Sequence, residues 1–313
     1  MKGKLFLLSA VAGSLLYSGD RLYRFAAARD MKKITRKKKG GQSSRRELPE
    51  EWRQMREDGK EVMRSLPHEA RCIISDDGLR LYGEYYRCAE PKRVVLCAHG
   101  YRGTAEGDFC DKIRFLRDAG CDLLLIHQRA CGESEGDAIT FGARESQDIL
   151  KWLDTIETDL PVYLYGISLG ATSVLLCADR TERIAGIIAD CGFSSMHAIL
   201  AYLGKRWMRL PAFPFLNILD GFCRVRAHFA MREADTADAL RNTRIPVLFF
   251  HGTEDAFVPP ENSRRSYELC GSAKKLVLTE KAGHNGSHLA DPDKYEKEVL
   301  DFFAEYDSEG RNV

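Results

Sequence analysis

The feature that most constrains this sequence is a serine set between two glycines at the end of an apolar run. Residues 163–171 read Tyr-Leu-Tyr-Gly-Ile-Ser-Leu-Gly-Ala: the apolar residues predict a strand, and residues 169–178 predict a helix. A sharp turn between strand and helix leaves room only for small residues two positions either side of the serine, and Gly166 and Gly170 meet this demand. The pattern predicts a nucleophile elbow that holds the Ser168 hydroxyl beside the first amides of a helix.

Segments of strand and helix type alternate along the body of the chain. Strands are expected at residues 71–75, 79–86, 93–98, 121–127, 162–166, 184–190, 245–251 and 275–278, with amphipathic helices between most of them. An Asp-Gly turn makes the first two strands a hairpin, whereas the later strands are continuous apolar runs. This alternation predicts an α/β fold with a mostly parallel central sheet and helices on both of its faces.

The loop after strand 93–98 carries candidate oxyanion-binding residues. His99, Gly100 and Gly103 lie there, and the small residues would let the backbone approach the elbow. The amide of Tyr101 could then join that of Leu169 in holding a negative charge that develops in the transition state. In this interpretation His99 and Gly100 support the elbow and shape the loop.

Two further loops supply a base and an acid. Asp255 follows strand 245–251 and His284 follows strand 275–278, so the chain order is Ser, Asp, His. The hydroxyl of Ser168 is too weakly acidic to attack alone, so His284 would take its proton. Asp255 would then fix the imidazole tautomer and stabilise the cation that forms.

Other residues compete for these roles. His288 could replace His284 as the base, and either Glu254 or Asp190 could be the acid. Cys131 and Cys191 are alternative nucleophiles, although packing roles are favoured for both thiols. The choice among these residues depends on contacts between distant loops.

These motifs resemble those of the α/β-hydrolase superfamily from about residue 70 to residue 306. The matching residues are His99-Gly100 with Gly103, Gln128–Ser134, Gly166–Gly170, His251–Asp255 with Val258-Pro259, and Gly283-His284. Within the superfamily the chain is similar to bacterial serine-aminopeptidase-like hydrolases, relatives of monoacylglycerol lipases that often carry an N-terminal hydrophobic segment. The segment His127–Gly132 departs from the usual Asp-x-Arg-Gly-His-Gly of such enzymes, but the resemblance makes that loop structural.

The interval of residues 192–242 has the composition of a helical lid inserted after the sixth strand. Bulky apolar residues dominate it, with basic residues between them. We expect its inner face either to accept an acyl chain or to pack the lid on the body. The apolar residues are Leu203, Trp207, Met208, Leu210, Pro211, Phe213, Pro214, Phe215, Leu216, Ile218, Leu219 and Phe222.

The N-terminal part differs in composition from the body at 47–313, which we expect to be the hydrolase domain. An uncharged stretch spans residues 5–19 within an N-terminal segment of residues 1–20, and residues 21–46 read as a basic linker. The stretch could anchor the chain in a membrane with its catalytic domain in the cytoplasm, be a cleaved signal peptide, or be a helix packed on the body.

Charge and cysteine content limit the partners. Residues 1–46 carry a formal charge of +11 and the remaining residues carry −10. This basic tail could bind an anionic surface, such as a membrane surface contacted by residues 5–39, or it could be a solvated linker. Nucleic-acid binding is not expected because residues 32–46 lack aromatics. Ten cysteines without a Cys-x-x-Cys pair favour a reducing compartment, and neither the single His68-Glu69 pair nor the His284/His288 loop reads as a metal site.

The expected function is a serine hydrolase acting on carboxylic esters of small-molecule or acyl type through an acyl-enzyme, without cofactor or metal. An aminopeptidase, amidase or thioesterase could use the same residues, and Glu133, Glu135 or Asp190 could bind a substrate amino terminus. A catalytically silent, membrane-tethered binding module is the alternative from another class.

Overall fold

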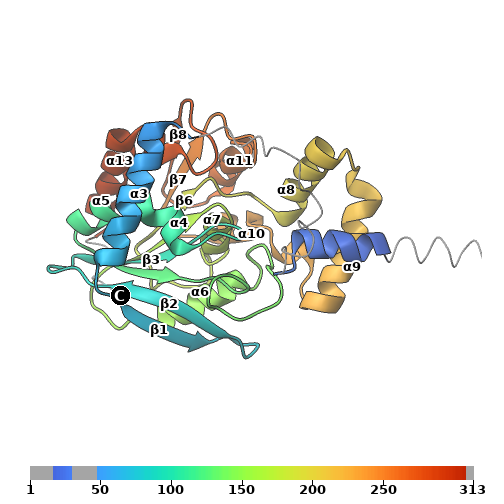
Figure 1. Ribbon diagram of the computed structural model, residues 1–313, viewed down its shortest axis with the longest axis horizontal. Coiled ribbons are helices and arrows are strands. Elements are labelled where there is room, and N and C mark those ends of the chain that lie inside the picture. Colours follow the sequence, from blue (N-terminus) through green and yellow to red (C-terminus); the bar gives the residue numbers. More distant parts are fainter. Residues whose placement is uncertain (1–16, 30–47, 308–313) are drawn as a thin grey trace, which may run out of the picture.

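The computed structural model describes residues 17–29 and 48–307, and its strands form one twisted sheet (Figure 1). The strand order is β1-β2-β4-β3-β5-β6-β7-β8; β1 and β2 run antiparallel to their neighbours, and the remaining strands are parallel. The expected mostly parallel sheet with an N-terminal hairpin is confirmed. The strands are β1 Glu69–Ile74, β2 Arg80–Tyr86, β3 Arg93–Ala98, β4 Cys121–Ile126, β5 Val162–Ile167, β6 Gly186–Asp190, β7 Val247–Gly252 and β8 Lys274–Thr279.

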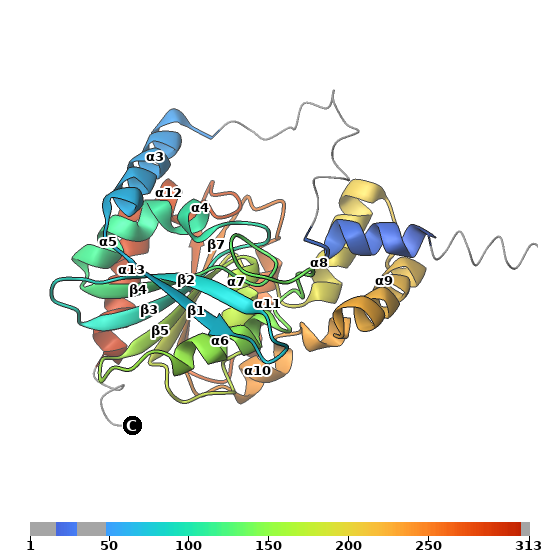
Figure 2. The ribbon, with the colours of Figure 1, turned by 60° about the horizontal axis from the view of Figure 1, so that its bottom comes forward.

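Helices cover both faces of the sheet (Figures 1 and 2). Alternate residues of each strand point to opposite faces, so in β3 Leu96 and Ala98 join one apolar cluster while Val95 and Cys97 join the other. The first cluster includes residues of α6, α7, α10 and α11, and the second includes residues of α3, α4, α5 and α13. The helices on the sheet are α3 Glu50–Ser65, α4 Ala105–Phe109, α5 Ile113–Asp118, α6 Glu145–Asp154, α7 Leu169–Leu175, α10 Ala237–Asn242, α11 Glu261–Leu269, α12 Ser287–Ala290 and α13 Pro292–Tyr306.

An outlying helical layer lies between β6 and β7 in the chain. It comprises α8 Met196–Leu203, a π-helical turn at Gly204–Met208 and α9 Ala212–Ala227, and it stands beside the carboxyl ends of the parallel strands (Figure 2). It falls inside the interval where the sequence predicts a lid after the sixth strand. A separate apolar cluster that includes Met196, Leu216 and Leu219 joins this layer to Phe141 and Leu169 of the body.

The N-terminal part packs on this layer. Residues 17–26 form a helix that lies against α9 (Figure 1), and the side chains of Tyr23, Ala26 and Ala27 are buried. Ala28 then pairs with Ala138 in an isolated bridge. Residues 21–29, the start of the basic linker predicted over residues 21–46, pack on the body: Tyr23, Ala26 and Ala27 are buried, and Arg29 donates to the carbonyls of Ser134 (2.6 Å) and Gly132 (2.8 Å).

The predicted anchor at residues 5–19 falls mainly on residues 1–16, which lie outside the described residues. Residues 17–19 belong to the packed helix, where Gly19 lies against the Phe222 ring. Among the helices of residues 17–29 and 48–307, none is both long enough and apolar enough to cross a membrane.

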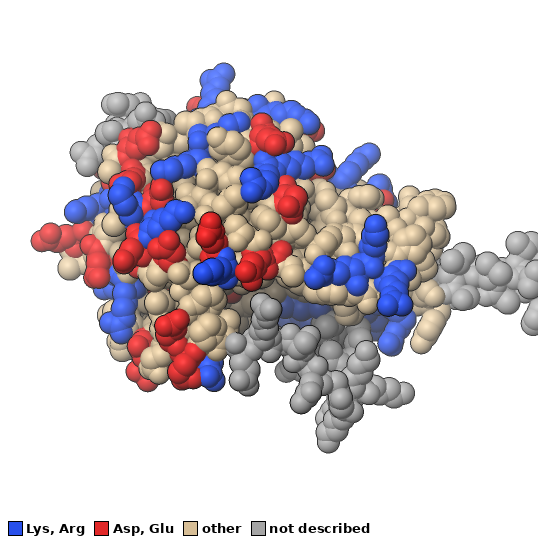
Figure 3. Space-filling view, turned by 90° about the horizontal axis from the view of Figure 1, so that it is seen from above, with Lys and Arg blue, Asp and Glu red and all other residues tan. Residues whose placement is uncertain are grey.

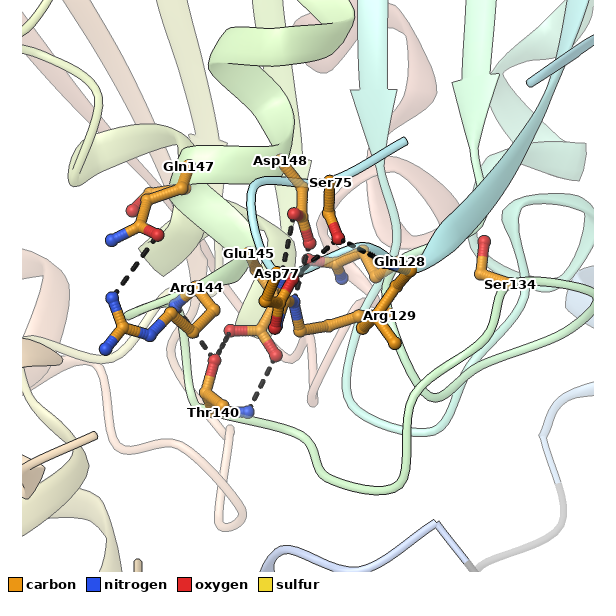
Figure 4. Close-up of polar contacts among 12 residues, drawn as sticks. Ser75, Asp77, Gln128, Arg129, Ser134, Thr140, Arg144, Glu145, Gln147 and Asp148 are labelled. Carbon is orange, nitrogen blue, oxygen red and sulfur yellow. Dashed lines mark hydrogen bonds and ion pairs between the residues drawn. The ribbon is translucent and has the colours of Figure 1, made fainter. Parts of the chain in front are cut away.

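A buried ionic cluster holds the loop between β4 and α6 (Figure 4). The guanidinium of Arg129 donates two hydrogen bonds of 2.7 Å to Asp148 of α6 and two, of 2.9 and 3.2 Å, to Asp77 of the β1–β2 turn. Glu145 accepts hydrogen bonds from the backbone amides of Thr140 (2.7 Å) and Gly142 (2.8 Å). These contacts fix the loop that places Phe141 beside the candidate site.

Candidate active site

Ser168 sits at the turn between β5 and α7 in a strained conformation. Its backbone has φ 56° and ψ −113°, which side-chain-bearing residues rarely adopt, and its amide donates to the carbonyl of Asp190 over 2.8 Å. A Cβ at Gly170 would overlap the backbone carbonyl of Ala98, and one at Gly166 would overlap that of Gly170. The two glycines are therefore required for the backbone to close this tightly.

The structure brings Ser168, His284 and Asp255 together from the loops after β5, β8 and β7. Nδ1 of His284 lies 2.6 Å from Oδ2 of Asp255, and Nε2 lies 2.9 Å from Oγ of Ser168. Because an ionised carboxylate can only accept, Nδ1 carries the proton and Nε2 is free to accept the serine proton. The imidazole thus bridges acid and hydroxyl in the geometry that proton transfer from Ser168 needs.

The carboxylate of Asp255 is buried and fully hydrogen-bonded. Oδ1 accepts the backbone amides of Phe257 (2.9 Å) and Val258 (2.8 Å), and Nε2 of His251 lies 3.3 Å from Oδ2. Burial alone raises the pKa of Asp255, but the N–H groups of His251 and His284 that face the carboxylate outweigh burial and hold the pKa well below its usual range. Asp255 therefore stays ionised beside His284.

His251 is a supporting residue that the sequence reasoning did not single out. It ends β7, its Nε2 also lies 2.8 Å from the carbonyl of Val258, and its Nδ1 lies 2.7 Å from the hydroxyl of Ser263. A carbonyl can only accept, so Nε2 carries the proton and Nδ1 accepts from Ser263. The signal available in the sequence was a histidine at a strand end four residues before Asp255.

The loop expected to provide an oxyanion hole lies against the elbow. A Cβ added at Gly100 would stand 3.3 Å from Cβ of Ser168, which places this backbone beside the nucleophile. Leu169 is the first residue of α7, so its amide has no acceptor within the helix. Tyr101 follows Gly100 and lines the same cavity as Ser168.

Asp108 of α4 braces this loop. Its Oδ2 accepts the amide of Gly100 over 2.7 Å, and its Oδ1 accepts from Nδ2 of Asn285, the residue after His284, over 3.2 Å. One carboxylate therefore connects the loop after β3 to the loop that carries the histidine. The sequence reasoning missed Asp108, which lies within the first helix after the loop.

His99 is buried and shapes the same loop. Its Nδ1 donates to the carbonyl of Gly100 over 2.8 Å, and its Nε2 accepts the amide of Gln128 over 3.1 Å. Burial lowers its pKa, which keeps the ring neutral. His99 is thus placed to support the backbone rather than to act as a base.

The competing acids and base lie elsewhere. Asp190 is fully buried, accepts a hydrogen bond of 2.9 Å from the hydroxyl of Tyr295, and does not line the cavity over Ser168. Glu254 is exposed, whereas Asp255 holds His284. His288 is buried between Asp111 (2.9 Å) and Glu296 (3.0 Å), away from the serine.

The residues proposed for binding a substrate amine, for thiol catalysis or for holding a metal do not fit the site. Glu133 and Glu135 are exposed and do not line the cavity at Ser168. Burial raises the pKa of Cys131 to about 11 and raises that of Cys191 well above its usual value, so both thiols stay protonated and are poor nucleophiles. Cys191 lies within 4.8 Å of the Asp255 and His284 groups, the one cluster of metal-ligand type in the described ranges, but these two already bond to each other.

A cavity of about 250 Å³ opens over Ser168, with walls that are almost entirely apolar. The lid contributes Ile199, Leu203, Trp207, Leu216 and Leu219, the body contributes Tyr101, Phe141, Phe193 and Phe257, and the N-terminal helix contributes Leu22, Phe25 and Ala26. Among the described residues that line it, Arg102 alone is charged. The N-terminal wall was missed from sequence because the basic residues around it suggested a linker.

An aromatic stack connects the lid to the candidate base. The ring of Trp207 stacks on that of Phe257 with centroids 5.4 Å apart, and Phe257 lies edge-on to His284 at 4.9 Å. The lid residue Trp207 therefore contacts a side chain that packs directly against the imidazole of His284.

Comparisons with known proteins show what the chain is similar to. A family model described as "Alpha/beta hydrolase family" matches residues 94–298. YqkD of Bacillus subtilis is 28% identical over 221 residues, covering 68% of this chain and 71% of its own length. Bem46 of Schizosaccharomyces pombe is 30% identical over 200 residues, covering 62% and 61%. Lysophosphatidylserine lipase ABHD12 of Danio rerio is 26% identical over 204 residues, covering 62% of this chain but only 51% of the lipase.

Solved structures give the same fold. An esterase of Pyrococcus furiosus superimposes with a TM-score of 0.63 at 20% identity, covering 78% of this chain and 92% of the esterase. Est1E of Butyrivibrio proteoclasticus, solved with ferulic acid, gives 0.60 at 22% identity, with coverage of 76% and 99%. At these identities the likeness establishes the fold alone, and the fold predicted from the sequence is confirmed.

Proposed function

Since the chain belongs to the alpha/beta hydrolase family, we propose that it is a serine hydrolase that cleaves carboxylic esters through Ser168, His284 and Asp255. One observation carries the proposal. A single imidazole contacts the serine hydroxyl at 2.9 Å through one nitrogen and the aspartate at 2.6 Å through the other. The relatives include lipases and esterases, which supports ester chemistry.

In the proposed mechanism Ser168 Oγ attacks the ester carbonyl while Nε2 of His284 takes the hydroxyl proton. Asp255 holds the imidazole in the required tautomer and stabilises the imidazolium. The imidazolium then gives its proton to the leaving alcohol, which leaves an acyl-enzyme. A water molecule, deprotonated by the same imidazole, releases the acid and restores Ser168.

The amides of Tyr101 and Leu169 are proposed to bind the oxyanion of each tetrahedral intermediate. Support comes from the position of Gly100 against Ser168 and from the placement of Leu169 at the start of α7. Loss of one such donor costs about 10²–10³ in rate in comparable sites. Asp108 would act as a positioning residue because it fixes the Gly100 amide.

We propose that the acyl part of the substrate is apolar and of intermediate length. The walls around Ser168 are apolar, and the cavity of about 250 Å³ is small for a ligand pocket, for which about 300–1,000 Å³ is typical. An aminopeptidase would need a carboxylate to bind the substrate ammonium group, and no carboxylate lines this cavity among the described residues. Thioesters share the acyl group and remain the second candidate substrates.

The first experiment separates an enzyme from a silent binding module. Wild-type protein should react with a fluorophosphonate probe, and Ser168→Ala should not, because the probe needs the activated hydroxyl. Ser173→Ala on the same helix is the matched control and should still react. Equal labelling of Ser168→Ala and wild type would reject Ser168 as the nucleophile.

The second experiment defines the substrate class. We expect kcat/KM for p-nitrophenyl esters to rise from acetate toward octanoate, because each added methylene buries apolar surface in the cavity. A panel of thioesters and aminoacyl amides is measured beside the esters. A preference for acetate, or faster turnover of aminoacyl amides than of esters, would contradict the proposed acyl-ester substrate.

For the uncharged N-terminal stretch we propose a membrane anchor that leaves the catalytic body in the cytoplasm, with its last residues, 17–19, packed against α9 where the chain joins the body. The stretch is uncharged and the residues that follow are rich in Lys and Arg, as expected for the cytoplasmic side. Fractionation of cells expressing the full chain, with protease protection of the body, tests this topology. Recovery of a chain cleaved near residue 20 would favour a signal peptide.

A further inference from the structure

The exposed apolar side chains of the described residues gather at one end of the molecule. Six of the nine large ones lie on the N-terminal helix or on residues 205–225. Phe213, Val225 and Tyr17 are 75%, 77% and 69% exposed, and Phe25, Trp207 and Met208 lie on the same two segments. We call residues 17–26 together with residues 205–226 the lid face.

The lid face is also strongly basic. Its two segments contain seven Lys or Arg residues and only two acids, Asp20 and Asp220. Asp20 pairs with Arg24 and Arg226, and Asp220 pairs with Arg224, so the charges of both acids are already offset. Figure 3 shows mainly Lys and Arg side chains at the end that carries the lid, whereas side chains of both charges are mixed over the rest of the view.

A second apolar hollow on the lid face adjoins the cavity over Ser168. A surface groove of about 410 Å³ runs between the N-terminal helix and the lid and is lined by Tyr17, Arg21 and Phe215 among others. Leu22, Phe25, Met208, Leu210 and Phe215 line both this groove and the cavity over Ser168. The groove on the lid face and the cavity over Ser168 are therefore adjacent and share apolar side chains.

We propose that the lid face docks on an anionic lipid bilayer, with its apolar side chains among the acyl chains and its basic side chains at the headgroups. Exposed Phe and Trp flanked by Lys and Arg are the composition of interfacial membrane-binding surfaces. The negative surface potential of anionic lipids attracts such basic residues. In the sequence, the uncharged residues 5–16 lead directly into Tyr17 at the edge of this face.

Docking in this orientation turns the groove toward the lipid. A single-chain lipid could then pass between the N-terminal helix and the lid without crossing water. It would also press Trp207 into the bilayer, and Trp207 stacks on Phe257 next to His284. The lid face thus connects the membrane surface to the candidate active site.

The first test measures whether Trp207 enters lipid. Full-length Ser168→Ala protein, which cannot hydrolyse lipid, is mixed with vesicles of phosphatidylcholine and phosphatidylglycerol that carry brominated acyl chains. The chain has three tryptophans: Trp152 is buried and Trp52 lies on α3, away from the lid face (Figure 1). We expect brominated lipid to quench part of the fluorescence, and Trp207→Phe to remove that quenching.

The second test removes charge. The triple change Lys205→Gln, Arg206→Gln and Arg209→Gln should weaken binding to these vesicles on the order of 100-fold, about fivefold for each charge. Lys275→Gln, Lys294→Gln and Lys297→Gln on β8 and α13, at another end of the molecule, is the matched control and should bind like the parent. Phe213→Ser should also weaken binding, whereas Leu300→Ser should not.

Two outcomes would overturn the proposal: an unquenched Trp207 in protein that binds vesicles, or equal losses in the lid-face and control triple variants. Either would mean that residues outside the lid face hold the chain on lipid. Binding is measured without turnover, so a negative result leaves the proposed ester hydrolysis untouched. Conversely, an inactive enzyme that docks as described would leave this inference standing.

Discussion

The hydroxyl of Tyr101 donates a hydrogen bond of 2.8 Å to the backbone carbonyl of Ala26, and this bond ties the N-terminal helix to the loop that flanks Ser168. Nη2 of Arg102, the next residue, donates to the carbonyl of Ala28 over 2.7 Å. Since Leu22 of the same helix lines the cavity over Ser168, this helix is a wall of the site.

Leu22→Trp should narrow the cavity and shift acyl preference. We expect kcat/KM for p-nitrophenyl octanoate to fall about tenfold or more, with little change for the acetate, because a filled pocket excludes the longer chain first. Arg24→Trp on the exposed side of the same helix is the control and should leave the ratio of the two rates unchanged. An equal loss on both esters would indicate a general disturbance of the site instead.

Removing the brace at Asp108 should slow turnover more than it weakens binding. Asp108→Ala frees the Gly100 amide and the Asn285 side chain, so the oxyanion loop and the histidine loop lose their common anchor. We expect kcat to fall about 10- to 100-fold, less than for direct loss of an oxyanion donor, with KM within a few-fold. Glu106→Ala, on the exposed side of α4, should behave as wild type. Loss of stability without any change in kcat would contradict the positioning role.

Two glycine-to-alanine changes should have opposite effects on stability. Gly170→Ala forces a Cβ into the Ala98 carbonyl, so we expect the protein not to fold or to lose several kcal/mol. At Gly221, exposed in α9, no heavy atom lies within 4 Å of the added Cβ. Gly221→Ala should therefore raise the free energy of unfolding by about 0.5–1 kcal/mol, measured by denaturant titration. A stable Gly170→Ala protein would mean that the elbow is less tight than described.

Arg129→Met should destabilise the fold because it leaves the buried carboxylate of Asp148 without its cationic partner. Breaking a buried pair typically costs about 3–5 kcal/mol, and we expect that range here. Burial raises the pKa of Asp148 to about 6 even with Arg129 beside it. Without Arg129 that carboxyl protonates more readily, so the loss of stability should be smaller at pH 5 than at pH 8. The exposed pair Arg183 and Asp154 is the control, and Arg183→Met should cost no more than about 1 kcal/mol.

The acid dependence of stability should reveal the ionised Asp255. A carboxyl whose pKa is lowered by folding stabilises the protein above its unfolded pKa of about 3.9, and that stabilisation is lost as pH falls toward the folded value. The difference in unfolding free energy between wild type and Asp255→Asn should thus be constant from about pH 7 to pH 5 and shrink below about pH 4. In activity assays Asp255→Asn should lose about 10⁴ in kcat. A stability difference that grows in acid would contradict the lowered pKa.

Much of the scaffold follows from local patterns. Gly166, Ser168 and Gly170 predict the elbow because the steric demand of a strand–turn–helix junction falls on those positions alone. The strands were found because continuous apolar runs between amphipathic helices suit a sheet covered on both faces. The observed ends of the strands differ from the predicted ends by about two residues: β6, for example, begins at Gly186, whereas the prediction began at residue 184.

The sequence by itself determined the α/β sheet, the elbow and the short set of residues from which an acid and a base could come, because these depend on residue type and spacing. The order of the motifs already favours Asp255 over Asp190 and His284 over His288, but only the tertiary structure shows that the loops of Asp255 and His284 meet Ser168 at the sheet edge. It alone placed residues 17–29 in the wall of the cavity and His251 beneath Asp255. Contacts between different loops and helices decide these points, such as those of His284 with Asp255, 29 residues away, and with Ser168, 116 residues away. The pattern of neighbours along the chain does not encode such contacts one by one.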